Sequence, residues 1–140
     1  AGDSEWRVPT LDVEDHIRMC CRRWQVVEIT ADPYRWSRSL EVLASENFPV
    51  TEFPQSPSRM TPATQRFLDM VNQRSLTHDG DPRLARHISN AVLKSDSRGT
   101  RIYKETRHSA KKIDLAVASI MALDRAVSFL EEPVPEFFIL

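Results

Sequence analysis

The stretch Val26-Val27-Glu28-Ile29-Thr30-Ala31 decides the fold class of this chain of 140 residues. Four of its six residues are β-branched, and alternation puts Val27, Ile29 and Ala31 on one face, which is typical of a strand. Asp32-Pro33 ends this strand, because the residue before a proline disfavours the helical region. Since proline suits the first turn of a helix, we expect a helix to follow.

That helix and a second strand complete a recognisable unit. Trp36, Leu40 and Leu43 form an apolar stripe at helical spacing. Residues 48–53 (FPVTEF) then alternate between apolar and polar, as a strand does. Strand, helix and strand in this order predict a right-handed parallel crossover.

Outside the crossover, the apolar periodicity predicts further helices and one more strand. Helices are expected at residues 13–24, from Thr61-Pro62 onward, at about 83–93 and at about 112–130, and a strand at 101–104. Alternating strands and helices predict an α/β architecture for a single domain of residues 1–130, followed by a proline-interrupted tail of residues 131–140. Three short strands are few for so much helix, so either the sheet is small or strands are missing.

Composition excludes several classes of protein. A hydrophobic fraction of 41% and a charged fraction of 28% are ordinary for a folded soluble protein, and no stretch approaches the roughly 20 apolar residues of a membrane helix. Only three glycines occur, which leaves no glycine-rich phosphate loop. The two cysteines, Cys20 and Cys21, are adjacent and lack the spacing of a structural disulfide or a zinc site. With no signal segment at the start, a reducing, cytoplasmic setting is expected.

Asp32 is the first candidate for chemistry. It stands at the carboxyl end of the strand that opens the crossover, where open α/β sheets place their ligand-binding groups. An aspartate directly before Pro33 is also a natural helix cap, and the two interpretations do not exclude each other.

The second candidate is Asp114, in the first turn of the last predicted helix. Steps of four and three residues from it reach Ala118 and Met121, so we expect its carboxylate to project along an apolar strip. A buried carboxylate would need a cation, a metal ion or hydrogen-bond donors nearby. The alternative is a favourable position at the positive end of the helix, paired with Lys111 or Lys112.

Basic residues gather just before Asp114, although the net charge of −1 conceals them. Between Arg83 and Lys112 nine lysines and arginines face only two acids, Asp96 and Glu105. Such a run fits the phosphate backbone of a nucleic acid, and a solvated charged face is the alternative.

Six blocks along residues 6–127 point to a family. They are Trp6-Arg7-Val8-Pro9, ITADPYRW (29–36), EFPQSPSRMTPAT (52–64), LTHDGDPRLARHISNAV (76–92), Arg98-Gly99 with Tyr103-Lys104-Glu105, and KIDLAVASIMALDRA (112–126). In this order and at these spacings, the blocks resemble the C-terminal nuclease domain of the large terminase subunit of tailed double-stranded DNA phages.

The resemblance implies a ribonuclease H-like fold of the α/β class, whose carboxylates bind two divalent ions and cut concatemeric phage DNA during genome packaging. Asp32 and Asp114 match two of these carboxylates, so both are expected to be catalytic ligands of Mg²⁺ or Mn²⁺. Neighbouring basic residues would hold DNA phosphates: Lys104, Arg101, Arg107, Lys111 and Lys112.

The family resemblance also implies binding partners, and it implies that the first strand of the domain is missing. The expected partners are double-stranded DNA, an upstream ATPase domain of the same protein, the portal and the small terminase subunit, in the bacterial host cytoplasm and away from any membrane. A further catalytic aspartate of the family lies on the first strand, which nothing before Trp6 supplies. We therefore expect a partial domain that lacks its opening antiparallel strands and is inactive by itself. A non-catalytic DNA-binding or assembly module, or an inactive prophage remnant, is the alternative.

Overall fold

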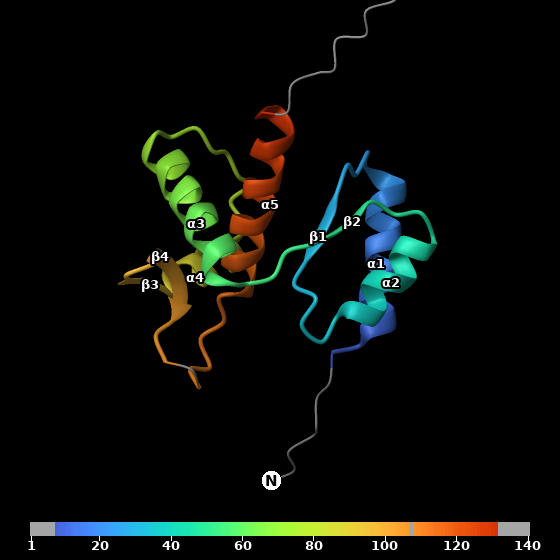
Figure 1. Cartoon of the computed structure of the whole chain (residues 1–140), viewed down its shortest axis with the longest axis horizontal. Coiled ribbons are helices and arrows are strands. Elements are labelled where there is room, and N and C mark those ends of the chain that lie inside the picture. Colours follow the sequence, from blue (N-terminus) through green and yellow to red (C-terminus); the bar gives the residue numbers. More distant parts are fainter. Residues whose placement is uncertain (1–7, 107, 132–140) are drawn as a thin grey trace, which may run out of the picture. The chain divides into compact units, whose positions relative to one another are not determined.

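The computed structural model describes residues 8–106 and 108–131, which fold into helices and short strands (Figure 1). The chain divides into two compact units between Pro54 and Gln55. In the described part of the chain, no helix has the length and apolar character needed to cross a membrane.

The first unit contains the predicted crossover. Its elements are α1 (Thr10–Arg23), β1 (Ile29–Ala31), α2 (Ser37–Ser45) and β2 (Val50–Glu52). The two strands pair in parallel with Ile29 opposite Val50, and the backbone N–H of Phe53 donates to the Ala31 carbonyl at 2.8 Å. The predicted strand, helix and parallel strand are confirmed, with both strands shorter than expected.

Apolar burial and a charged contact hold the first unit together. Leu40 and Leu43, on the predicted stripe of α2, are buried. Because they cover the inner face of α2, they supply much of the hydrophobic stabilisation of this small unit. On the outer side, the Arg18 guanidinium of α1 donates two hydrogen bonds of 2.7 Å to the carboxylate of Glu46, just after α2.

The second unit packs three helices with a hairpin. Its elements are α3 (Pro57–Asn72), α4 (Pro82–Ser89), β3 (Ala91–Asp96), β4 (Gly99–Lys104) and α5 (Asp114–Glu131). Strands β3 and β4 are antiparallel, α3 packs on β4 and α5, and α4 packs on α5 (Figure 1). The buried apolar side chains of this unit are Met60, Ala63, Ile113, Ala116, Ile120 and Met121.

Two sequence expectations for the second unit are wrong. The helix expected at about 83–93 ends at Ser89, and residues 91–96 form β3, because they pair along their whole length with β4. Val92 and Leu93 are apolar residues that fit either a helix or a strand, and long-range pairing decides between them. The helix expected from Thr61-Pro62 onward begins four residues earlier, at Pro57, since the first helical position needs no N–H donor.

Candidate functional site

Asp32 lies where the sequence predicts it, directly after β1 at the carboxyl end of the parallel pair. It is half-buried, and its Oδ1 accepts the backbone N–H of Tyr34 at 3.0 Å. This contact is a local turn and not the helix cap that the sequence predicts, because α2 begins only at Ser37 with Trp36 as its N-cap. Within the described part of the chain, Oδ2 accepts no hydrogen bond, so one oxygen stays available to a ligand.

Asp114 is the first residue of α5, and its side chain is exposed, so the expectation that it lines an apolar strip is wrong. The helix turns Ala116 and Ile120 into the core, which leaves Asp114 and Ala118 facing solvent.

The predicted ion pair with a neighbouring lysine does not form either. The Nζ of Lys111 bonds to Glu105 at 3.1 Å, and among the described residues the Asp114 carboxylate has no ion pair or hydrogen bond. Asp114 is therefore an uncommitted carboxylate at the start of a helix.

Two side chains of the α4 segment hold the start of α5. The Nδ1 of His87 accepts the backbone N–H of Leu115 at 2.9 Å, and the Nδ2 of Asn90 donates to the Lys112 carbonyl at 2.9 Å. These contacts flank Asp114 on both sides. The sequence reasoning missed them, and the only signal for them is the spacing of three that puts His87 and Asn90 on one side of α4.

The two candidate carboxylates stand in different units, Asp32 in the first and Asp114 in the second. Their convergence therefore remains a prediction. Among residues 8–106 and 108–131, no three His, Cys, Asp or Glu side chains gather to form a metal site. The donor chemistry of the pair nevertheless fits Mg²⁺ or Mn²⁺, because hard divalent ions prefer carboxylate oxygens and both residues offer an oxygen that bonds to no described residue.

Lys104, Lys111 and Lys112 are the predicted DNA ligands that reach the surface near α5. Lys111 and Lys112 are exposed just before the helix, and Lys104 is half-buried at the end of β4. Arg107 lies outside the described residues. Of the residues that the structure describes, these three lysines are the ones placed to attract phosphates in the predicted DNA contact.

Arg101 is placed differently, because its side chain is buried and fully engaged. The guanidinium donates to the Tyr103 hydroxyl at 3.1 Å, to Thr61 Oγ1 at 3.0 Å and to Asp96 Oδ2 at 2.5 Å. The hydrogen bond to Arg101, with further donors from Arg98, lowers the pKa of the Asp96 carboxyl well below its usual range. Contact of Arg101 with DNA stays a prediction, and it would require Arg101 to give up one of these partners.

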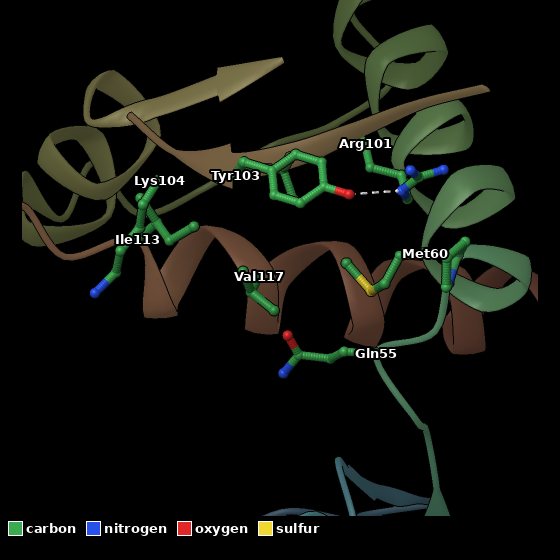
Figure 2. A pocket seen from close by; sticks show the side chains of 9 residues that line it. Gln55, Met60, Arg101, Tyr103, Lys104, Ile113 and Val117 are labelled. Carbon is green, nitrogen blue, oxygen red and sulfur yellow. Dashed lines mark hydrogen bonds between the residues drawn. The ribbon is translucent and has the colours of Figure 1, made fainter. Parts of the chain in front are cut away.

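A shallow pocket opens beside this network. It has a volume of about 270 Å³, and Figure 2 shows Tyr103 and Lys104 from β4 lying over Val117 of α5 and over Ile113, which directly precedes that helix. Met60 and Gln55 close its other side. Ile113, Val117 and Met60 make part of its lining apolar, and Lys104 adds a cationic side chain.

Comparison with known proteins agrees with the sequence resemblance. Residues 7–129 match the protein family described as "Terminase large subunit, endonuclease domain". The "Gene 13 protein" of Mycobacterium phage L5 and that of Mycobacterium phage D29 are each 30% identical over 136 residues, covering 88% of this chain and 23% of either phage protein. The chain thus spans about a quarter of the length of these relatives.

A solved structure agrees on the fold. The crystal structure of the HK97 bacteriophage large terminase matches with a TM-score of 0.72 and 21% sequence identity, over 84% of this chain and 25% of that one. This match confirms the predicted α/β, ribonuclease H-like fold class.

Proposed function

This chain belongs to the terminase large subunit endonuclease domain family, and from that membership we propose that it is a nuclease module that cuts concatemeric double-stranded DNA during phage genome packaging. In this proposal the module works within a longer large subunit that also carries an ATPase domain. It acts in the cytoplasm of the bacterial host, where the portal and the small terminase subunit are its partners.

One observation carries the proposal: Asp32 and Asp114, the carboxylates that match the family pattern, each keep oxygen available for a ligand. Asp32 commits one oxygen to its own turn, and Asp114 commits none to the described residues. They are 82 positions apart in the sequence, so only the tertiary structure can join them.

Asp32 and Asp114 would hold Mg²⁺ or Mn²⁺, and a pair of such ions supplies an activated water and stabilises the leaving oxygen. The chain's own residues bind and align the DNA. Lys104, Lys111 and Lys112 neutralise phosphates on the surface next to Asp114, which brings a phosphodiester close to that carboxylate. Arg101 supports this surface by tying β4 to α3 through Thr61.

The test is DNA cleavage by the full-length terminase in the presence of Mn²⁺. Asp32→Asn keeps an acceptor for the Tyr34 N–H, and Asp114→Asn alters an exposed side chain, so both variants should fold. We expect each to lose cleavage by on the order of a hundredfold, because several kcal/mol of charge stabilisation by the metal disappear.

Two matched control variants test whether an aspartate-to-asparagine change in a similar setting lowers cleavage by itself. Asp79 makes a turn of the same kind, with its Oδ1 accepting the Asp81 N–H at 3.0 Å, and Asp12 is an exposed aspartate in the first turn of α1. Asp79→Asn and Asp12→Asn should cut DNA normally. Full activity of Asp32→Asn or Asp114→Asn would refute the site. Salt-dependent DNA binding without any Mn²⁺-dependent cleavage would favour the non-catalytic module, and loss of both would favour the inactive remnant.

A further inference from the structure

The proposed cleavage chemistry does not explain the position and the contacts of the short helix α4. It has eight residues, Pro82–Ser89, and none of them is buried. A helix of this length has little stability in isolation, so its position depends on its ends and on its contacts. Its first turn is capped by Asp81, whose Oδ1 accepts the Arg83 N–H at 2.7 Å, and the helix packs on α5.

Two polar contacts from the C-terminal end of α4 and the residue after it reach the backbone on either side of Asp114. His87 Nδ1 accepts the Leu115 N–H at 2.9 Å. Leu115 is the second residue of α5, so its N–H is one of the four that a helix leaves unpaired at its start. Asn90 Nδ2 donates to the carbonyl of Lys112 at 2.9 Å, two residues before Asp114.

We propose that His87 and Asn90 are positioning residues that set the place of the Asp114 carboxylate by clamping the backbone around it. The proposal rests on the proposed function of Asp114. Among the described residues no side chain bonds to this exposed carboxylate, so the contacts that hold its backbone are the restraint that the structure shows on its position. A ligand of a metal ion must be held to within a fraction of an ångström, and displacement of a catalytic group by about 1 Å costs on the order of a hundredfold in rate.

Of the two clamping residues, His87 gives the sharper test because a conservative variant exists. In His87→Asn the amide oxygen takes the place of Nδ1 and can still accept the Leu115 N–H, whereas His87→Leu offers no acceptor. His78 is the matched control, since its Nδ1 accepts the Gly80 N–H at 3.0 Å within its own loop.

The first readout is amide hydrogen exchange at Leu115, measured on the 140-residue chain. His87→Leu should speed this exchange about tenfold, the factor that corresponds to the free energy of one typical hydrogen bond. His87→Asn and His78→Leu should leave it within about twofold of the unaltered chain.

The second readout is the cleavage kinetics of the full-length terminase. His87→Leu should lower kcat about tenfold and leave the KM for DNA unchanged, His87→Asn should restore kcat, and His78→Leu should have no effect. Faster Leu115 exchange with an unchanged kcat would overturn the positioning role, and so would unchanged exchange.

Asp114→Asn, measured in the same cleavage assay, distinguishes failure of the positioning role from failure of the proposed function. If it abolishes cleavage while His87→Leu cuts normally, only the positioning role fails. If Asp114→Asn itself cuts normally, the proposed function fails and the positioning role with it.

Discussion

At the scale of single residues, the contact between Gly99 and Thr61 shows how tightly the hairpin meets α3. Gly99 opens β4 with a φ of +106°, a left-handed conformation that side chains rarely adopt. A Cβ built there would lie 2.5 Å from the Thr61 Cγ2. Thr61 cannot easily turn away, because its Oγ1 accepts the Arg101 guanidinium at 3.0 Å. The glycine is therefore required both for its backbone and for space.

Gly99→Ala should accordingly lower the free energy of unfolding of the second unit by about 2 to 3 kcal/mol. Gly80→Ala provides the comparison, since Gly80 also has a positive φ, +81°, but no atom within 4 Å of its added Cβ. Gly80→Ala should lower the free energy of unfolding by only about 1 kcal/mol, because only the backbone conformation disfavours the alanine. Urea unfolding followed at α3 and β4 measures both. Equal losses would show that the contact with Thr61 does not limit packing.

The candidate site illustrates what single residues in the sequence can and cannot predict. The position of Asp32 at the end of a strand was predictable, because the strand before it and the proline after it are local signals. The position of Asp114 was predictable as well, but its exposure was not. Periodicity along α5 is blurred by alanines on both sides, and contact with α3 and α4 decides which side is buried.

At the scale of elements, the segment from α4 to β3 marks the limit of local reasoning. Residues 83–93 carry apolar side chains at spacings that suit a helix throughout, and the structure divides them between α4 and β3. The deciding factor is the partner strand β4, whose register places Val92 opposite Tyr103. No local pattern contains that information, because strand pairing depends on a distant segment.

The cap of α4 makes the stability of the fold depend on pH. The side chain of Arg83 bonds to the Asp81 carboxylate, as does the Arg83 backbone N–H, and together these bonds lower the pKa of Asp81 to about 2. A carboxyl whose pKa is lower in the folded chain stabilises the fold above its unfolded pKa of about 4, and this contribution disappears as the pH falls toward 2.

The difference in Tm between the chain and Asp81→Ala should therefore be full at pH 6. It should shrink between about pH 4 and pH 2 and vanish below that range, where Asp81 is protonated in both states. Thermal unfolding monitored at α4 across this pH series is the measurement. A difference that stays constant down to pH 2 would mean that the carboxylate charge does not cap the helix.

At the scale of the whole molecule, the crossover and the fold class were predictable, and the relation between the two units was not. The first unit follows from a β-branched strand, a proline and an apolar stripe, all within residues 26–53. Joining Asp32 to Asp114 requires contacts across 82 positions, for which one sequence offers no local signal. The expectation that the two carboxylates share one metal site comes from the resemblance of the sequence to the terminase nuclease family.

The most direct test of that shared site is paramagnetic broadening of amide resonances by Mn²⁺ in the 140-residue chain. We predict that the amides next to Asp32 and Asp114 broaden together, and that Asp32→Asn removes the broadening at both places while the amides near exposed Asp79 respond as before. Broadening near Asp114 that persists unchanged in Asp32→Asn would show two independent sites and contradict the account.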